Sequence, residues 1–285
     1  MTYLSSVLMG ILQGVAEFLP ISSSGHLALF QRFFAVENYE ETQMFFTVLL
    51  HLGTLISVFV YYWQDIWDMI REFFAFLGDL FGGRGRGRRS VAGPVPPARR
   101  LILLIVVGTL PLFAILPVKD LVEEAMGNAA FVSVALIATG FILFFSDRMA
   151  RGRKDARNAT MLDALLVGCA QALGTLPGIS RSGSTISAGM LRGFDRTFAV
   201  RFSFLMSLPA VLGANLLTLV DVIKEGSIDV SMLPVYLVGT AVAGVVGYFA
   251  IHLVNLLTNK GKFGAFAYYC WIMGAVSLVA NFVVK

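Results

Sequence analysis

The chain has 285 residues, of which 57% are hydrophobic and only 14% are charged. Soluble domains average about 25% charged residues, and so few charges cannot cover a water-facing surface. The mean hydropathy of +0.77 agrees with this conclusion. The composition therefore excludes an ordinary soluble protein and indicates an integral membrane protein.

The net charge of +4 raises the question of a nucleic-acid partner. The arginine-rich stretches lie between apolar segments, however, where the basic cytoplasmic loops of membrane proteins already explain them. We therefore expect no nucleic-acid partner. The two cysteines, Cys169 and Cys270, lie in apolar stretches without the spacing of a metal site or a disulfide framework.

In chain order, an apolar stretch at 4–34 is interrupted midway, and a second interrupted stretch lies at 162–192. A spanning helix needs about 20 apolar residues. Six uninterrupted runs meet this length and are predicted to cross the membrane: 43–63, 100–118, 128–147, 198–221, 232–256 and 264–284. The first run is expected to continue as an amphipathic helix at 64–81. A flexible cytoplasmic loop is predicted to follow at 82–98.

The two interrupted stretches are predicted to be re-entrant helical hairpins, because each half is shorter than a bilayer crossing. Irregular backbone at membrane depth is tolerated only where protein buries it or where it lines a wet cavity. Each interruption is therefore a candidate site. The stretches also resemble each other: at an offset of 158, Gly10, Gln13, Ser22, Ser24 and Gly25 coincide with Gly168, Gln171, Ser180, Ser182 and Gly183. Chance similarity of short apolar segments is the alternative to duplication.

Three spans separate the two copies, so the copies are predicted to enter the membrane from opposite faces. The fold class is then an all-α integral membrane protein with an inverted-topology repeat, six transmembrane helices and two re-entrant hairpins. We expect one membrane domain over 1–285, with repeats at about 1–150 and 160–285. Basic loops gather on one side, which is predicted to be cytoplasmic.

Two formally charged side chains, Glu17 and Arg181, lie deep in the apolar segments, one in each interruption. A charge at bilayer depth costs at least about 2.5–3.5 kcal/mol on insertion scales, so a functional role is the first hypothesis. A purely structural ion pair that locks the two repeats together is the alternative.

The first interruption combines oxygen ligands with hydroxyl groups. Gln13 and Glu17 are four residues apart, so their side-chain oxygens project from one helical face and suit a hard divalent cation or a general base. Pro20 ends the helix, and three serines followed by a glycine exceed what helix capping needs. Such a turn offers hydroxyls and free N–H groups to an anion. His26 adds an acid, base or nucleophile. The residues after Pro20 are Ser22, Ser23, Ser24, Gly25 and His26.

The second interruption places Arg181 among hydroxyl groups at the start of another helix. A guanidinium can bind phosphate oxygens with two parallel hydrogen bonds. The neighbouring hydroxyl residues are Ser180, Ser182 and Thr185. Together, the two interruptions suit hydrolysis of a phosphate ester or phosphoanhydride at the membrane.

The motifs EFLPISSSGH and PGISRSGST resemble the two signatures of the bacterial undecaprenyl-diphosphatases, the bacitracin-resistance family. The resemblance covers nearly the whole chain. It implies hydrolysis of undecaprenyl diphosphate to undecaprenyl phosphate and inorganic phosphate, which recycles the lipid carrier of peptidoglycan synthesis. It also implies Mg²⁺ or Ca²⁺ as cofactor, and a multi-pass protein of the bacterial inner membrane whose site faces the extracytoplasmic side.

The resemblance also implies roles for single residues. Glu17, Ser23, His26 and Arg181 match the catalytic positions, with Ser23 preferred over His26 as the nucleophile. Gln13 and Glu17 match the metal-binding [EQ]xxxE motif. The substrate-binding positions are Ser22, Ser24, Gly25, Ser180, Ser182 and Thr185. Some members have an arginine in the last helix where this chain has Cys270, which puts the details of substrate binding in question.

A polyprenyl-phosphate transporter or flippase is the alternative function, because inverted repeats with broken helices are common in transporters. A purely structural scaffold would leave the two buried charges unexplained. Small residues at 238–250 predict close helix packing, and a homodimer interface is one form it could take. His51, in the first span, could face the site, but the preferred interpretation is a buried, hydrogen-bonded histidine, and His252 also receives a structural interpretation.

Overall fold

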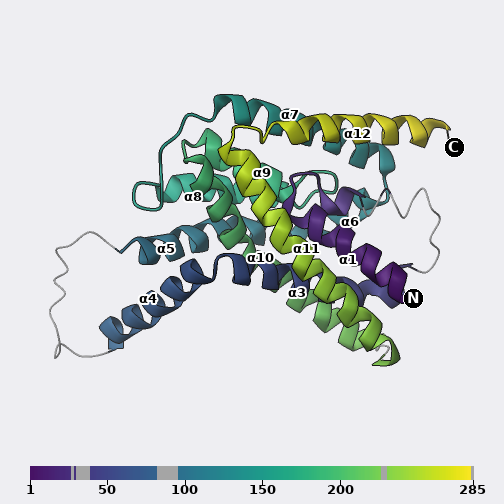
Figure 1. The fold of residues 1–285 in the computed structure, drawn as a ribbon, viewed down its shortest axis with the longest axis horizontal. Helices are drawn as coiled ribbons and strands as arrows, with labels where there is room; N and C mark the ends of the chain where they lie inside the picture. Colours follow the sequence, from purple (N-terminus) through teal and green to yellow (C-terminus); the bar gives the residue numbers. More distant parts are fainter. Residues whose placement is uncertain (27–28, 30–38, 82–95, 226–229, 284–285) are drawn as a thin grey trace.

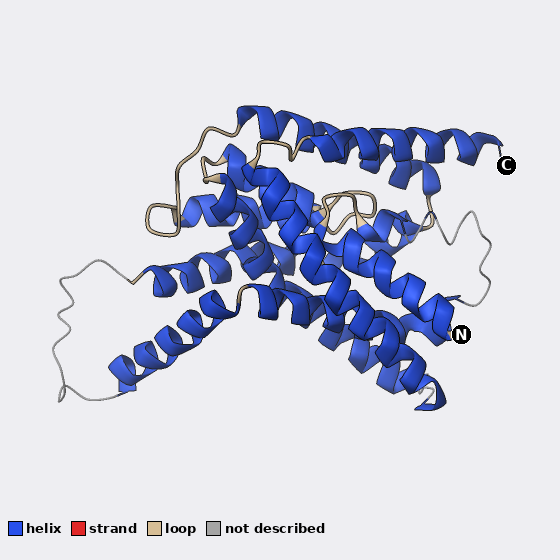
Figure 2. Ribbon diagram, in the orientation of Figure 1, coloured by secondary structure: helices blue, strands red, loops and turns tan. Residues whose placement is uncertain are grey.

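The structure is a computed structural model that describes residues 1–26, 29, 39–81, 96–225 and 230–283. Within these ranges the regular structure is helical, apart from one isolated parallel bridge between Lys154 and Phe194 (Figure 2). The α-helices are α1 (Tyr3–Phe18), α3 (Tyr39–Tyr61), α4 (Trp63–Phe81), α5 (Pro97–Thr109), α6 (Lys119–Met126), α7 (Ala129–Met149), α8 (Met161–Leu173), α9 (Arg181–Leu191), α10 (Arg196–Glu225), α11 (Leu233–Asn259) and α12 (Ala265–Val283). Short 3-10 helices lie at Leu110–Ala114, Leu116–Val118 and Val230–Met232.

Six helical segments of the described chain are long and apolar enough to cross a membrane, which confirms the predicted all-α membrane fold. They coincide with the six predicted runs: Met44–Tyr61, Pro97–Val122, Ala129–Met149, Arg196–Lys224, Leu233–Asn259 and Ala265–Val283. The amphipathic extension is also confirmed, as α4. The two interrupted stretches form the shorter apolar helices α1 and α8, together with α9.

The second predicted span is not one continuous α-helix. Its α-helix, α5, ends at Thr109, and two 3-10 segments contain Pro111 and Pro117. Proline removes a backbone donor and clashes with the preceding turn, which explains the change. The start of α5 also corrects the predicted loop at 82–98, because Pro97 is favoured in the first turn of a helix and α5 begins there. Residues 82–95 of that loop lie outside the described part.

Glycines let α11 pack closely against α1 and α3. A Cβ on Gly239 would lie 2.5 Å from the Ser6 hydroxyl, and a Cβ on Gly14 would lie 2.8 Å from the Ala243 carbonyl oxygen. On the other side, a Cβ on Gly244 would lie 3.1 Å from the Gly53 carbonyl oxygen. The close packing predicted for 238–250 is therefore confirmed. At these positions the partner helices belong to the same chain.

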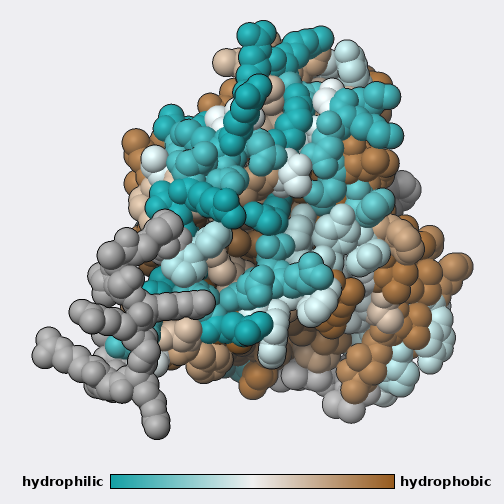
Figure 3. All heavy atoms as spheres, turned by 60° about the vertical axis from the view of Figure 1, so that its left-hand side comes forward, coloured by the Kyte–Doolittle hydropathy of each residue, from teal (hydrophilic) through white to brown (hydrophobic). Residues whose placement is uncertain are grey.

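α8 and α9 pack against each other as a hairpin, with the start of α8 beside the end of α9 (Figure 1). The buried Asp163 carboxylate, in the first turn of α8, accepts hydrogen bonds from Lys154 Nζ at 2.8 Å and from Arg192 Nε, just after α9, at 2.9 Å. Figure 3 turns this side forward and shows hydrophilic side chains gathered there. Asp163 also forms a capping box with Thr160 at the start of α8.

Replacing Asp163 with asparagine is expected to destabilise the hairpin by about 2–3 kcal/mol, because charge-assisted hydrogen bonds to a buried carboxylate are lost. Burial alone would raise the pKa of Asp163, but hydrogen bonds from Lys154, Thr160 and Arg192 hold it well below its usual range. The stabilisation that comes from this lowered pKa is complete well above the unfolded pKa of about 3.9. It is lost progressively as the pH falls from that value towards the folded pKa. Thermal unfolding in detergent should show a deficit for the variant that is constant at neutral pH and shrinks only below about pH 4.

Candidate functional site

The first helix break turns the chain sharply within four residues. α1 ends at Phe18, Leu19 is extended, and the helix resumes at Ser23 after Pro20. Ser22 adopts the left-handed conformation with φ 68°, which is uncommon for a residue with a Cβ. Its hydroxyl oxygen accepts a hydrogen bond from the Gly25 N–H at 3.2 Å. The serines therefore begin a new helix.

The second break makes the same local hydrogen bonds. Ser180 caps α9, and its hydroxyl oxygen accepts from the Gly183 N–H at 3.1 Å. The Ser180 and Ser182 hydroxyl oxygens lie 3.3 Å apart, and those of Ser22 and Ser24 lie 3.4 Å apart. This agreement at matching positions supports a duplication. The inverted topology stays a prediction.

The two breaks pack directly against each other. A Cβ on Gly25 would lie 3.0 Å from the Cα of Gly178, which itself has φ +91°. The Ser182 hydroxyl is 3.4 Å from the Leu19 carbonyl oxygen, to which it donates. Thr139 on α7 holds the second break, because its hydroxyl donates to the Gly178 carbonyl at 3.0 Å. The close approach requires glycine at both positions.

Glu17 and Arg181 form an ion pair across this junction, between Glu17 Oε1 and Arg181 Nη2. The Glu17 side chain is 6% exposed and the Arg181 side chain 20% exposed. The structure therefore brings together the two charges that the sequence places far apart. Each charge offsets the cost of burying the other.

The second carboxylate oxygen of Glu17 lies among three polar side chains. Gln13 Nε2 donates to Glu17 Oε2 at 3.1 Å, and the Ser23 hydroxyl donates to the same oxygen at 3.4 Å. His51 Nδ1 lies 3.7 Å from this oxygen and 3.1 Å from Gln13 Nε2. His51 is hydrogen-bonded, as interpreted, but its side chain is 29% exposed rather than buried, and it lies on the side of Glu17, as the alternative interpretation had it. The sequence signal that could have placed His51 at the site is that it is a histidine within a spanning helix.

His26 lies beside the last helix. Its Nδ1 is 2.8 Å from the Ser22 carbonyl oxygen, which can only accept, so Nδ1 must donate. Its Nε2 is 2.7 Å from the Tyr269 hydroxyl, and the two rings stack with centroids 5.5 Å apart. Sequence reasoning missed Tyr269. Among the described hydrogen bonds, none joins His26 to Glu17 or Ser23.

The hydroxyls of the second break are largely used within the fold. Thr185 donates to the Arg181 carbonyl at 2.9 Å, and its hydroxyl lies 2.5 Å from that of Ser203 on α10. Ser180, Ser182 and Thr185 are all buried. Their predicted contact with substrate stays a prediction, and their visible role is to fix the start of α9 and hence the Arg181 backbone.

Cys270, which stands where some family members have an arginine, lies at the edge of this junction. Its side chain is fully buried, and the thiol lies 3.5 Å from the Pro20 carbonyl oxygen. It therefore contacts the first break from α12, next to Tyr269. Among the described residues, Arg181 is the arginine that contacts Glu17.

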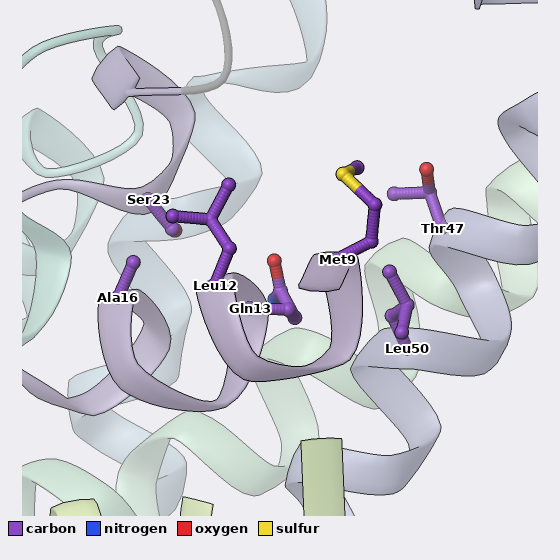
Figure 4. A pocket seen from close by; sticks show the side chains of 7 residues that line it. All are labelled: Met9, Leu12, Gln13, Ala16, Ser23, Thr47 and Leu50. Carbon is purple, nitrogen blue, oxygen red and sulfur yellow. The ribbon is translucent and has the colours of Figure 1, made fainter. Parts of the chain in front are cut away.

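A small pocket lies between α1, α3 and the first break (Figure 4). Gln13, Ser23 and Thr47 give it polar groups, and the rest of its lining is apolar. The full lining is Met9, Leu12, Gln13, Ala16, Ser23, Thr47 and Leu50. In Figure 4 the Gln13 side-chain oxygen is directed upward between Leu12 and Met9. The pocket thus combines an apolar wall with hydroxyl and amide oxygens.

The donor set of this site fits a hard cation that also binds substrate. One carboxylate, one amide oxygen and one hydroxyl are available from Glu17, Gln13 and Ser23. The described residues form no group of three or more His, Cys, Asp or Glu side chains that could hold a metal. Magnesium sites commonly use one or two carboxylates and take their other ligands from water and substrate phosphates. The residues fit such a shared site rather than a cage made by protein alone.

The fold and the site define a multi-pass membrane protein with a buried acid, arginine and serine at the junction of two broken helices. A family model described as "Bacitracin resistance protein BacA" matches residues 6–276. The chain belongs to this family.

Curated relatives match almost end to end. The chain is 37% identical over 282 residues to an undecaprenyl-diphosphatase of Methanosphaera stadtmanae, with 98% of each chain covered. It is 38% identical over 280 residues to an undecaprenyl-diphosphatase of Alkaliphilus metalliredigens, again with 98% of each chain covered. A third undecaprenyl-diphosphatase, from Carboxydothermus hydrogenoformans, is 36% identical over 282 residues and covers 98% of this chain and 97% of its own.

Proposed function

We propose that this protein hydrolyses undecaprenyl diphosphate to undecaprenyl phosphate and inorganic phosphate. The observation that supports it most directly is the Glu17 carboxylate, which lies between the Ser23 hydroxyl and the Arg181 guanidinium at the junction of the two breaks. The names of the full-length relatives support the same activity. In the cell, this reaction recycles the lipid carrier of peptidoglycan synthesis and gives resistance to bacitracin.

Substrate binding begins with a change of partner at Arg181. In the structure Glu17 neutralises Arg181, which keeps both charges tolerable in the membrane. The diphosphate offers several anionic oxygens that suit the planar guanidinium. When Arg181 binds them, the Glu17 carboxylate loses its counter-charge and becomes a stronger base. Binding of the correct headgroup thus activates the site.

Ser23 then attacks the terminal phosphorus. A bond forms between Ser23 Oγ and phosphorus, the bond to the bridging oxygen breaks, and undecaprenyl phosphate leaves. Glu17 takes the Ser23 proton, for which the 3.4 Å hydrogen bond to Oε2 already provides the path. Arg181 stabilises the charge that develops on the transferred phosphoryl oxygens.

Water completes the reaction by attacking the phosphoserine. Its oxygen bonds to phosphorus, the Ser23 Oγ–phosphorus bond breaks, and the serine regains a proton as inorganic phosphate leaves. His26 and Glu17 are the groups near Ser23 in sequence that can move these protons. The His26 Nε2 lies 2.7 Å from the Tyr269 hydroxyl, so this tyrosine helps to hold the imidazole.

Gln13 and Glu17 would hold the divalent cation, Mg²⁺ or Ca²⁺, together with phosphate oxygens of the substrate. When bound, the cation neutralises phosphate charge. A shared site of this kind needs only one carboxylate, Glu17, from the described residues, and it makes the affinity for metal dependent on the headgroup.

The arrangement in the membrane belongs to the same proposal. The hydrophilic end with Asp163, Lys154 and Arg192 is cytoplasmic, so α8 and α9 form a hairpin that enters from that face. The other hairpin is the one predicted for 4–34, of which residues 27–28 and 30–34 lie outside the described part. The site then opens to the extracytoplasmic side of a bacterial inner membrane. A homodimer is compatible with this arrangement.

Phosphate release from undecaprenyl diphosphate by the purified protein in detergent is the direct test. We expect release with Mg²⁺ or Ca²⁺ and at least about a tenfold loss after EDTA treatment, restored by excess cation. Release unaffected by EDTA would contradict the metal assignment alone. No release with either cation from a folded protein would contradict the enzyme and favour the transporter, because broken helices also suit a lipid-phosphate carrier.

A further inference from the structure

Both ring nitrogens of His26 have partners, and the two partners differ in kind. Nδ1 lies 2.8 Å from the Ser22 carbonyl oxygen, and Nε2 lies 2.7 Å from the Tyr269 hydroxyl. A carbonyl oxygen only accepts hydrogen bonds, whereas a tyrosine hydroxyl both donates and accepts. Nδ1 must therefore carry a proton whether the imidazole is neutral or charged. The proton that His26 gains or releases is the one on Nε2, beside Tyr269.

The Tyr269 hydroxyl suits both protonation states of that nitrogen. Its O–H can donate to Nε2 when the imidazole is neutral, and its oxygen can accept from the Nε2 proton when the imidazole is charged. The planes of the two rings are also nearly parallel, 13° apart, with their centroids separated by 5.5 Å. The hydroxyl restrains the edge of the imidazole, and the ring contact restrains its plane. One residue of α12 thus holds His26 in two ways.

α12 is itself fixed at this level by close packing next to Tyr269. The Cys270 thiol lies 3.5 Å from the Pro20 carbonyl oxygen, so the next residue along the helix contacts the first break. A Cβ on Gly140 of α7 would lie 2.5 Å from the Trp271 ring, which leaves no room for a larger residue there. A side chain on a packed helix is positioned more precisely than one on a loop. Tyr269 therefore offers His26 a rigid partner.

We infer that Tyr269 is a positioning residue that acts through His26: it holds the imidazole so that Nε2, the nitrogen that exchanges its proton, keeps one fixed direction. This inference rests on the proposed function, in which His26 moves protons while the phosphoserine is hydrolysed. A histidine serves as acid or base only in the correct tautomer and orientation, which the partners of its ring nitrogens set. Ser22 sets the tautomer and Tyr269 the orientation. Among the described hydrogen bonds, none joins Tyr269 to Glu17 or Arg181.

Three substitutions separate the hydroxyl from the ring and from general packing. Tyr269→Phe keeps the ring and removes the hydroxyl, whereas Tyr269→Leu removes both. Tyr268→Phe is the matched control, because it removes a hydroxyl one residue away, from a ring that packs against Trp271 with centroids 5.6 Å apart. Tyr268 is 55% exposed and Tyr269 39% exposed, so none of the three changes leaves a buried cavity.

Nitrogen NMR of histidine-labelled protein in lipid bilayers reads the contact directly, because the chain has three histidines. A His26→Ala sample identifies the signals of His26 by their loss. Tyr269→Phe should move the Nε2 resonance of His26 and leave its Nδ1 resonance nearly in place, since Ser22 still accepts from Nδ1. Tyr268→Phe should move neither. An unchanged Nε2 resonance in Tyr269→Phe would overturn the inference, with or without phosphate release.

Kinetics show whether the contact matters for the reaction. We expect Tyr269→Phe to lower kcat for phosphate release by about 10–100-fold and to leave KM within about twofold, the loss of one hydrogen bond to a group that becomes charged. Tyr269→Leu should lose at least as much, and Tyr268→Phe should match the wild type. Full turnover by Tyr269→Phe would also overturn the inference.

A His26→Ala background tests whether Tyr269 acts through His26. With no imidazole left to position, Tyr269→Phe should lower kcat by less than about twofold further in this background. A further loss as large as in the wild type would refute the positioning role. If the wild type released no phosphate while Tyr269→Phe moved the Nε2 resonance as expected, the contact would stand and the proposed function alone would fail.

Discussion

Replacing Arg181 with alanine is expected to lower kcat/KM for phosphate release by at least about 10³-fold. Phosphoryl transfer depends mainly on positioning and on charge stabilisation, and arginines that act on the transition state contribute about 10³–10⁵-fold. Arg181 is the guanidinium at the junction of the two breaks, and the Ser180 cap and the Thr139 hydrogen bonds fix its backbone. Arg181→Lys should recover only part of the rate, because a point charge cannot form two parallel hydrogen bonds. Kinetics in detergent with Mg²⁺ measure both.

The ion pair with Glu17 also admits a purely structural explanation, and a double variant distinguishes the two. If the pair only joined the repeats, Glu17→Gln with Arg181→Gln would remove both buried charges and leave a folded, active protein. We expect the double variant to be folded and inactive. Arg196→Ala is the matched control, since Arg196 pairs with Asp147 on another helix away from the pocket. It should lower the unfolding temperature while the folded fraction retains turnover.

The six spans and the two breaks were predictable because lipid imposes strict rules on the backbone. A run of about 20 apolar residues has few alternatives to a helix in a bilayer, and a Pro/Ser/Gly cluster within a shorter run must be buried. The two isolated charges, Glu17 and Arg181, were given functional roles as the first hypothesis and a structural ion pair as the alternative, because a single charge is costly at bilayer depth. The structure shows them paired with each other, and their catalytic roles stay a prediction.

Contacts that depend on helix rotation could not be predicted. Whether His51 faces Glu17 or a neighbouring helix depends on a rotation of α3 that the apolar sequence around it leaves undetermined. Tyr269 reaches His26 only because α12 packs against α7 at the level of the first break. The division of the second span at Pro111 was overlooked because hydropathy does not register lost backbone donors.

Replacing Ser23 with alanine is expected to lower phosphate release by about 10⁴-fold or more, because removal of a nucleophile abolishes the covalent route. Ser23 is the hydroxyl that contacts Glu17 and lines the pocket. His26→Ala should cost less, because His26 hydrogen-bonds to Ser22 and Tyr269 rather than to Glu17. Ser146→Ala, which removes a buried hydroxyl bonded to Ser187 away from the pocket, should leave turnover within about threefold of the wild type.

The chemical stability of a trapped intermediate identifies the nucleophile independently of rates. With substrate labelled on its terminal phosphate, rapid quenching should leave label on the wild-type chain and none on the Ser23→Ala variant. A phosphoserine survives acid and is lost in base, whereas a phosphohistidine behaves in the opposite way. Acid-stable label on the peptide that contains Ser23 is the expected result. Label that is lost in acid, and that persists in Ser23→Ala but disappears in His26→Ala, would transfer the attack to His26. Glu17 and Arg181 would keep their roles, because a histidine nucleophile also needs the phosphoryl charge held by Arg181.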